Sequence, residues 1–342
     1  MTAAQYDVAV VGGGPAGAAC AWRLRQHGIN VAILDLAAFP REKLCAGWVT
    51  PDVFENLEMS PDDYPHGIVR FDRIHAHYRW ARVPVRTTQY SVRRFEFDAF
   101  LVQRAGVPVH QHRVRKVART GDGFDIDGQF SVRTIVGAGG TRCPIYRTFF
   151  NNCMERPAYS QIVALEKEFR YDWTDPRCHL FFFDEGLKGY SWYVPKAGGY
   201  LNCGVGGMAE DIQTKSQHIK DHWQVLLQRL ARIGVPEDAM AEPHGYSYYL
   251  RERNDVTELP GLYLIGDALG LATRDLGEGI GPAVQSGVQT ADRIRAGEPL
   301  LLDDIYSFSP IKPRLSRMLD RRWKRSCTSP AARGTPGELA SS

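Results

Sequence analysis

The chain has 342 residues, of which 44% are hydrophobic and 24% charged, and these proportions exclude a disordered or fibrous protein. A formal net charge of +3 is slight for a length that accommodates two subdomains around a shared core. The basic clusters at 113–119 and 321–325 are interpreted as solvated faces, so nucleic acid is not an expected partner. Seven scattered cysteines without CxxC or Cys/His spacing favour a reducing compartment and argue against disulfides or a metal site.

The distribution of apolar residues contains neither a secretory pattern nor a membrane span. The N-terminal residues enter a strand pattern directly, and no apolar run approaches the roughly 20 residues of a transmembrane helix. We therefore expect a cytoplasmic protein, with peripheral contact at a membrane surface as the alternative.

The first predicted unit, residues 6–35, is a strand, a glycine-rich turn, a helix and a second strand. The turn has the spacing GxGxxG, and the predicted phosphate cradle comprises Gly12, Gly14, Pro15, Ala16 and Gly17. These glycines permit a tight turn and close approach of the backbone to a pyrophosphate at the positive end of the helix. Asp35 closes the second strand, where a carboxylate accepts hydrogen bonds from ribose hydroxyls. The unit predicts dinucleotide binding; the alternative is a glycine turn of structural use only.

The later elements surround an extended middle region. Alternation typical of strands occurs at 68–93, helical spacing at 95–105 and around 211–233, short strands at 107–136, extended segments at 158–207, and a strand–glycine–helix unit at 259–295. This order predicts an α/β fold in which a Rossmann-like nucleotide-binding domain is interrupted by a mixed-sheet substrate-binding domain. The predicted boundaries are 1–66, 94–155 and 258–297 for the first domain, and 67–93 and 156–257 for the second, followed by a C-terminal helical segment (298–325) and a disordered tail (326–342).

The last of these units indicates which dinucleotide is bound. Gly266 and Asp267 stand at the tip of an apolar strand, and Gly277 and Gly279 precede a helix that begins near Ile280. This segment resembles the second FAD-contacting motif of the p-hydroxybenzoate hydroxylase-like flavoprotein superfamily, and "IVGAGGTR" at 135–142 resembles its middle motif. The resemblance implies a GR2-type FAD-binding domain, with Asp267 at the ribityl or pyrophosphate region and the following helix directed at the flavin pyrimidine edge.

Two residues depart from that superfamily pattern. Gly139 stands where relatives commonly carry Asp, and Arg274 where they commonly carry Pro. These departures bear on the approach of a nicotinamide and on the loop over the flavin ring more than on flavin binding itself.

The stretch "GYSWYVPKAGGYLNCGVGG", residues 189–207, resembles the (Y/F)xWxxP…GxG signature of the geranylgeranyl reductase family. "PREKLCAGWVTP" (40–51) is similar to that family's PRxKxCGGG segment, and "RFEFDAFL" (94–101) to the RxxFDxxL element of the superfamily. The likeness covers about residues 5–295. It implies substrate contacts at Trp48, Tyr190, Trp192, Val194, Pro195, Gly204 and Gly206, and further cofactor contacts at Arg41, Cys45, Ala46, Gly47 and Arg94.

Alternation places Tyr190, Trp192 and Val194 on one face of a strand, where they form either a cavity wall or an ordinary core strand. We favour the wall because the GxG that follows permits close backbone approach to a ligand. The resemblance makes Cys45 a candidate proton donor or gating group, and Tyr190 a second candidate donor; the alternative for Cys45 is packing, which is also the interpretation for Cys20 and Cys203. His75 and His77 are interpreted as an exposed or hydrogen-bonded pair rather than metal ligands.

The resemblance predicts an FAD-dependent oxidoreductase that reduces carbon–carbon double bonds of a hydrophobic, isoprenoid-like small molecule. No second GxGxxG is present, so the electrons are expected from NAD(P)H that docks transiently or from an external carrier. The alternatives are a flavin-dependent monooxygenase on the same fold (a hydroxylase or, less favoured, a halogenase) and a flavoprotein without turnover.

Overall fold

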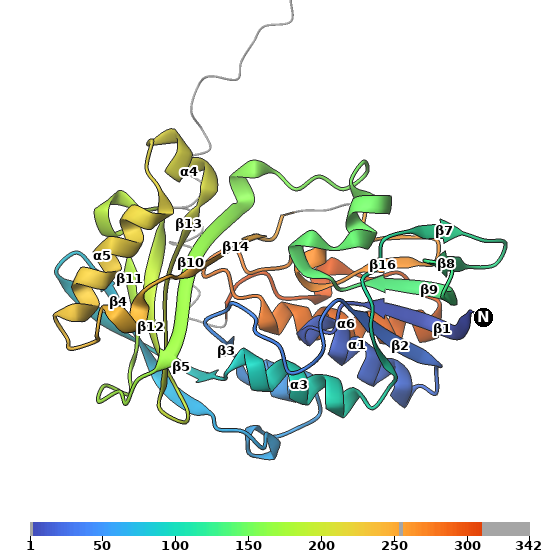
Figure 1. The fold of residues 1–342 in the computed structure, drawn as a ribbon, viewed down its shortest axis with the longest axis horizontal. Helices are drawn as coiled ribbons and strands as arrows, with labels where there is room; N and C mark the ends of the chain where they lie inside the picture. The colour runs from blue at the N-terminus through green and yellow to red at the C-terminus, as the bar shows by residue number, and fades with distance from the viewer. Residues whose placement is uncertain (1–2, 253–255, 310–342) are drawn as a thin grey trace, which may run out of the picture.

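Two eight-stranded sheets organise residues 3–252 and 256–309, the part of the chain that the computed structural model describes (Figure 1). Sheet A has the strand order β15-β16-β9-β1-β2-β6, with β8 pairing with β9 and β7 with β8. Its strands are β1 (Ala4–Val11), β2 (Val31–Asp35), β6 (Val109–Gln111), β7 (Val117–Arg119), β8 (Phe124–Ile126), β9 (Phe130–Gly137), β15 (Glu258–Leu259) and β16 (Leu262–Leu264). Strand β1 pairs in parallel with both β2 and β9, as a βαβ unit requires.

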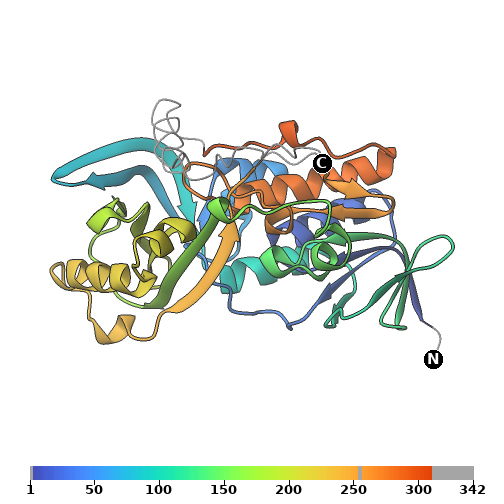
Figure 2. The ribbon, with the colours of Figure 1, turned by 90° about the horizontal axis from the view of Figure 1, so that it is seen from above.

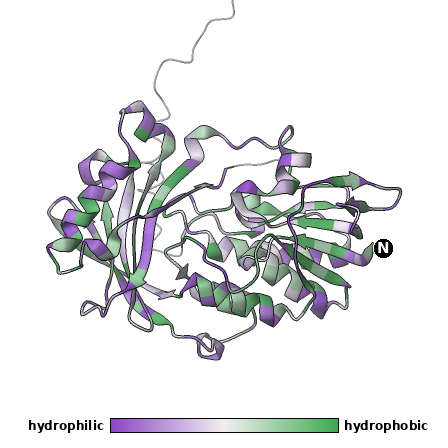
Figure 3. Cartoon of the chain, in the orientation of Figure 1, coloured by the Kyte–Doolittle hydropathy of each residue, from purple (hydrophilic) through white to green (hydrophobic). Residues whose placement is uncertain are grey.

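Helices cover one face of sheet A. They are α1 (Pro15–Gln26), α2 (Pro51–Asn56), α3 (Arg94–Ala105) and α6 (Ile280–Ala296). Along β1, Val8 and Val10 pack with these helices, whereas Ala9 and Val11 enter the core on the opposite face. Figure 3 shows hydrophobic colouring along the strands of this sheet. Both faces of the sheet are buried, which explains the continuous apolar run that begins the chain.

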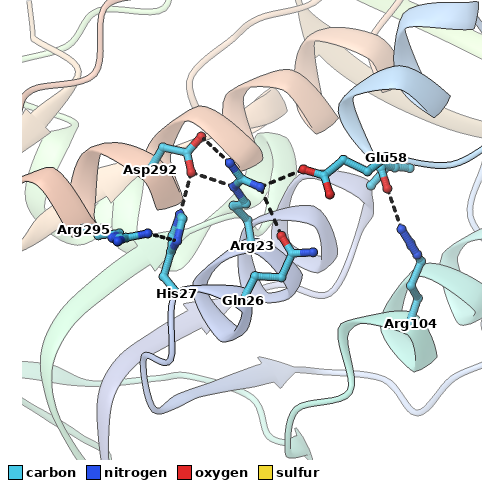
Figure 4. Close-up of polar contacts among 8 residues, drawn as sticks. Arg23, Gln26, His27, Glu58, Arg104, Asp292 and Arg295 are labelled. Atoms are coloured by element: carbon cyan, nitrogen blue, oxygen red, sulfur yellow. Dashed lines mark hydrogen bonds and ion pairs between the residues drawn. The ribbon is translucent and has the colours of Figure 1, made fainter.

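A polar network fastens the outer ends of α1 and α6 (Figure 4). Arg23 donates to Asp292 at 2.7 Å and to Glu58 at 2.8 Å, and His27 shares the same Asp292 carboxylate at 2.6 Å. The two helices also approach closely, because a side chain at Gly287 would lie under 3.0 Å from the Ala16 carbonyl oxygen. The amino-terminal turns of α1 and α6 are thereby held as neighbours.

Sheet B has the order β14-β10-β13-β12-β11-β4-β5-β3 and occupies the opposite side of the molecule from the N-terminus (Figure 1). Its strands are β3 (Trp48–Val49), β4 (Val69–Tyr78), β5 (Ala81–Ser91), β10 (Gln161–Arg170), β11 (Cys178–Phe182), β12 (Gly189–Lys196), β13 (Tyr200–Met208) and β14 (His244–Tyr249). One face packs against α5 (Ile219–Ala231), and the other packs against residues of the sheet A region, including Ala272 and Leu276. This second face carries Tyr190 and Trp192 of β12.

The predicted α/β class, with a Rossmann-like unit and a mixed second sheet, is confirmed. The helical region expected around 211–233 consists of two helices, α4 (Ala209–Thr214) and α5, which are separated by a turn in which Ser216 has φ = +52°. Trp48–Val49 pairs with β5 in sheet B although 1–66 was assigned to the nucleotide-binding domain. The domain boundaries otherwise stay a prediction.

Of the C-terminal segment predicted as helical, residues 298–309 contain one 3-10 turn, Leu302–Asp304. Residues 310–325 and the predicted disordered tail lie outside the described residues. Within residues 3–252 and 256–309, no helix has the length and apolar character that crossing a bilayer requires.

Candidate functional site

The GxGxxG turn forms a cradle whose geometry requires its first and last glycines. Gly12 has φ = +113°, and a Cβ there would lie under 3.0 Å from the carbonyl oxygen of Ala138. A Cβ at Gly17 would strike the carbonyl oxygen of Gly12. Gly14 differs, because the nearest atom to an added Cβ is Nη2 of Arg41 at 3.8 Å. The side of Gly14 therefore has room, and none of the described side chains caps the amino terminus of α1 that begins there. Uncapped amides beside open space fit a phosphate group.

Asp35 fastens this turn to the end of β2. Its Oδ2 accepts the amide hydrogen of Gly13 at 2.7 Å, and its Oδ1 accepts that of Ala37 at 2.9 Å. The carboxylate thus orders the turn, a role that the sequence motif did not indicate; its binding of ribose stays a prediction. Arg41 lies 3.8 Å from Asp35 and 3.6 Å from Asp98, and its buried Nε has no hydrogen-bond partner among the described residues.

The second predicted FAD motif lies beside the cradle. Gly266 and Asp267 follow β16 in a 3-10 turn, and Gly266 (φ = +59°) packs between Ala16 of α1 and Ala283 of α6. A Cβ at Gly279, the N-cap of α6, would lie 3.3 Å from Oδ1 of Asp267, and no side chain in the described part of the chain caps that helix. The structure therefore brings together two uncapped helix termini and one carboxylate from opposite ends of the chain.

At the other predicted glycines of this region, the backbone conformation or a close neighbour favours the absence of a side chain. Gly277 has φ = +67° and lies against the hydroxyl of Tyr248. Gly139 lies at the end of β9, where a side chain would press on Cys143 at 3.1 Å. An Asp at this position would meet that contact, which gives a local reason for the departure from the superfamily pattern. Ile280 is buried at the first turn of α6.

Cys45 lies in a loop held by polar side chains of sheet B. Its amide donates to Oε1 of Glu166 at 2.5 Å, and its carbonyl accepts from the Asn202 amide at 3.4 Å. The Sγ atom accepts the amide hydrogen of Gly47 at 3.3 Å. Lys196 donates to the carbonyl oxygens of Ala46 and Val92, the latter at 2.6 Å. The loop that the sequence singled out is thus rigidly supported.

These supporting residues were missed by the sequence analysis. Glu166 is 2% exposed and Lys196 is fully buried. Burial raises the pKa of Glu166 to about 7 and lowers the pKa of Lys196 from its usual value. The one available signal was a charged residue at an inward position: Lys196 directly follows the YxWxVP run, and Glu166 interrupts the apolar stretch "IVAL".

Arg94 is buried against the same loop. Its guanidinium forms a paired interaction with Asp98 at 2.6 and 2.9 Å, and its charged form is stabilised by Asp98 and Cys45, although burial opposes it. The net effect raises the pKa of Arg94. The side chain joins α3 to the Cys45 loop, so the RxxFDxxL element has a structural role here, and its contact with a cofactor stays a prediction.

Tyr190 and Trp192 of β12 lie on one face of sheet B, whereas Tyr193 packs on the α5 face. Tyr190, Trp192 and Val194 belong to one apolar cluster with Trp48 of the Cys45 loop, and Trp48 has a buried indole nitrogen without a hydrogen-bond partner among the described residues. The Tyr190 hydroxyl donates to the Leu276 carbonyl at 2.5 Å, and burial raises its pKa well above the usual value. That hydrogen bond attaches the wall to the loop that precedes Gly277.

The two GxG glycines differ in what surrounds them. A Cβ at Gly204 would lie under 3.0 Å from the Trp192 ring, whose Nε1 donates to Asn202 at 2.8 Å. Core packing of Trp192 therefore demands Gly204, contrary to the expectation that only a ligand would need it. Gly206 has a nearest neighbour at 3.5 Å and is not demanded in this way. Pro195 and Val194 are buried within the sheet.

The remaining candidates have ordinary partners. Cys20 and Cys203 are fully buried in apolar clusters, in agreement with packing roles. His77 is hydrogen-bonded to His179 at 2.9 Å, and His75 to Arg82. The histidine pair is thus hydrogen-bonded, as the strand alternation favoured.

The comparisons with known proteins agree with this geometry. The family model described as FAD dependent oxidoreductase (DAO) matches residues 7–89. An uncharacterized protein of Methanosarcina barkeri is 27% identical over 94% of this chain and 81% of its own length. A digeranylgeranylglycerophospholipid reductase of Methanopyrus kandleri is 29% identical, over 59% of this chain and 58% of its own. A geranylgeranyl diphosphate reductase of Rhodobacter capsulatus is 24% identical over 86% and 77%.

Solved structures share the fold. A geranylgeranyl bacteriochlorophyll reductase-like protein of Thermoplasma acidophilum has a TM-score of 0.74 at 18% identity, covering 94% of this chain and 84% of its own. The flavin-dependent brominase Bmp2 has a TM-score of 0.68 at 18% identity, covering 86% and 79%. The structural likeness establishes the architecture, whereas sequence identities this low leave the reaction open.

Proposed function

Because this chain is an FAD-dependent oxidoreductase with geranylgeranyl reductase-like relatives, we propose that it reduces carbon–carbon double bonds of a hydrophobic, isoprenoid-like substrate. One observation carries the proposal. The aromatic cluster of β12 and Trp48 is fastened to the second FAD motif by the hydrogen bond from Tyr190 to Leu276. An apolar surface of flat rings next to a flavin suits an elongated apolar molecule.

The residues present fit FAD. The uncapped amino terminus of α1 beside the open side of Gly14 would receive the pyrophosphate, and Asp267 with the amino terminus of α6 would hold the ribityl chain and the pyrimidine edge. When bound, FAD supplies the hydride equivalent that an alkene reduction consumes. The reductant that recharges it is NAD(P)H or an external electron carrier in this proposal.

The chain's own part is orientation, exclusion of water and delivery of a proton. We assign the proton to the Cys45 thiol rather than to Tyr190, because the Tyr190 hydroxyl already donates to Leu276. The Cys45 loop is held on both sides, by Glu166 and Lys196, so a thiol there keeps one position relative to the aromatic cluster.

Anaerobic turnover tests this function. The protein with FAD, a chemical reductant and a short polyprenyl diphosphate is expected to yield product that is two hydrogens heavier by mass spectrometry. Product that forms only with oxygen would support a monooxygenase or halogenase instead. Bound FAD with no product from any polyprenyl substrate would support a flavoprotein without turnover, and either result overturns the proposal.

A further inference from the structure

The hairpin of β4 and β5 ends in an unusual turn. Figure 2 shows the two strands running out to the end of the molecule opposite the N-terminus. The turn residues are Arg79 and Trp80, and Trp80 is 93% exposed. Val83, next on β5, is 54% exposed. A single exposed apolar residue is common, but a tryptophan with almost no contact with the protein contributes nothing to the core.

Folding gives no reason for this turn sequence. Arg79 has φ = +54°, a left-handed conformation that short hairpin turns normally assign to Asn, Asp or Gly. Its guanidinium lies 5.5 Å from the Tyr78 ring centre. Apart from that contact, the exposed turn adds nothing to the core, and a local rule that is broken there points to a role outside the fold.

The hairpin is strongly basic. From Arg73 to Gln89 the sequence has four arginines and two histidines and contains no Asp or Glu, so this short segment has a formal charge of +4, against +3 for the whole chain. Among neighbouring acidic residues, Asp72 pairs with Arg70, and Asp184 pairs with Arg229. The tip therefore attracts negatively charged surfaces.

A series of aromatic rings leads from the tip to the candidate site. Strand register puts Tyr78 and Val83 on the same face of the hairpin, because Tyr78 is opposite Ala81 and Ala76 is opposite Val83. Ring centres are separated by 6.0 Å from Tyr78 to Phe183 and by 6.0 Å from Phe183 to Phe182. The separation is 5.3 Å from Phe182 to Tyr190 and 5.9 Å from Tyr190 to Trp192.

We propose that the β4–β5 hairpin tip docks on an anionic lipid surface, with Trp80 in the headgroup region and Arg79 and Arg82 against the lipid phosphates. Tryptophan prefers the water–lipid boundary, and arginine keeps its charge in the headgroups while its stem covers apolar surface. The proposal deepens the proposed function and rests on it in one respect. An apolar substrate from the bilayer would pass along the series of aromatic rings to Tyr190 and Trp192.

Vesicle flotation of the full-length, flavin-loaded protein tests the docking. The vesicles contain phosphatidylcholine and phosphatidylglycerol at about 3:1, or phosphatidylcholine alone. Wild type is expected to float with the anionic vesicles, and rising salt is expected to weaken that binding. Trp80→Ser should lower the partition coefficient at least about fivefold, and Arg79→Asn about fivefold, since asparagine retains the left-handed turn.

Two matched variants serve as controls. Ile233→Ser removes another exposed apolar side chain, 55% exposed, and Arg133→Asn removes another arginine, whose side chain is 80% exposed. Both are expected to float like wild type. Because Trp80 is almost fully exposed, its variant should also keep the wild-type melting temperature, which separates docking from folding.

The docking is wrong if wild type does not float, if it binds neutral and anionic vesicles equally, or if Trp80→Ser and Arg79→Asn bind like wild type. Equal losses in the control variants would also overturn it. Flotation needs no turnover: a protein that floats but reduces no polyprenyl substrate contradicts the proposed function alone, whereas one that reduces a water-soluble polyprenyl compound without floating contradicts the docking alone.

Discussion

At the scale of single residues, the environment of the buried Glu278 carboxyl group predicts that the stability of the protein depends on pH. It is 8% exposed, and Asp275 and the side chain of Ser309 lie close by. Burial, and then the charge of Asp275, raise the pKa of Glu278 to about 8. The folded protein therefore holds a proton that the unfolded chain releases above about pH 4.3. Stability from this group is complete at low pH and is lost as the pH rises toward 8.

Glu278→Gln is expected to remove this pH dependence. At pH 5 the free energies of unfolding of variant and wild type should agree within about 1 kcal/mol, because Gln resembles the protonated acid. At pH 9 the variant should be more stable by roughly 5 kcal/mol, the equivalent of the pKa shift from about 4.3 to about 8. Urea unfolding at both pH values measures the difference, and Glu55→Gln, at an exposed position, is the control. A variant whose difference from wild type is the same at both pH values would refute the pKa assignment.

Strands β12 and β13 illustrate the scale of the element, where a glycine is fixed by its cross-strand neighbour. The ring of Trp192 lies over Gly204, with its nitrogen held by Asn202 in the same strand as the glycine. At Gly206, two positions along the same strand face, the nearest atom to an added Cβ is that of Ala164 at 3.5 Å, an ordinary contact. Packing of the Trp192 ring therefore requires glycine at position 204 and does not require it at position 206.

Gly204→Ala should accordingly destabilise the protein by about 2 kcal/mol or more, since the Trp192 ring has to move within a packed core. Gly206→Ala is the matched control and should change stability by less than about 1 kcal/mol. Chemical denaturation compares the two, and near-UV circular dichroism reports the displaced indole. Equal effects of the two substitutions would show that Trp192 does not decide the identity of residue 204.

At the scale of the whole molecule, the two sheets are joined around the candidate site. Thr141, after β9, donates to the Ser247 carbonyl of β14 at 3.0 Å. Arg156 donates to the carbonyl oxygens of Thr141 and Ala268 and stacks on Tyr146, its Cζ lying 3.4 Å from the ring centre. A cofactor that binds both α1 and α6 is therefore expected to raise the free energy of unfolding of the whole molecule.

FAD is expected to stabilise the protein by mass action. At a free concentration about 100 times the dissociation constant, the gain is about 2.7 kcal/mol, visible as a rise in the thermal midpoint. Gly14→Ala should leave the flavin-free midpoint unchanged, because the nearest atom to its Cβ is Nη2 of Arg41 at 3.8 Å, an ordinary contact, and should weaken FAD binding about tenfold or more. Gly121→Ala, in open space in the β7–β8 turn, is the control. A midpoint that FAD does not shift would contradict the assigned cofactor site.

Local patterns in the sequence determined several parts of this protein. The β1–α1–β2 unit follows from an apolar run, the GxGxxG spacing and a helix stop at Gly28, which has φ = +74°. Helix α3 was predicted from the spacing of "FEFDAFLVQRA", and the single strand face of Tyr190, Trp192 and Val194 from a period of two. Each of these signals lies within a few neighbouring residues, so backbone conformation and side-chain periodicity are sufficient to reveal it.

Only the tertiary structure decided which distant residues support the site. The Cys45 loop is contacted by side chains from strands more than a hundred residues away, those of Glu166, Lys196 and Asn202. The residues next to them in the sequence do not indicate that contact. The same holds for Gly204, whose identity depends on a ring across the sheet, and for the break between α4 and α5. Burial and cross-strand packing set these features, and both are properties of the folded chain that a local pattern does not encode.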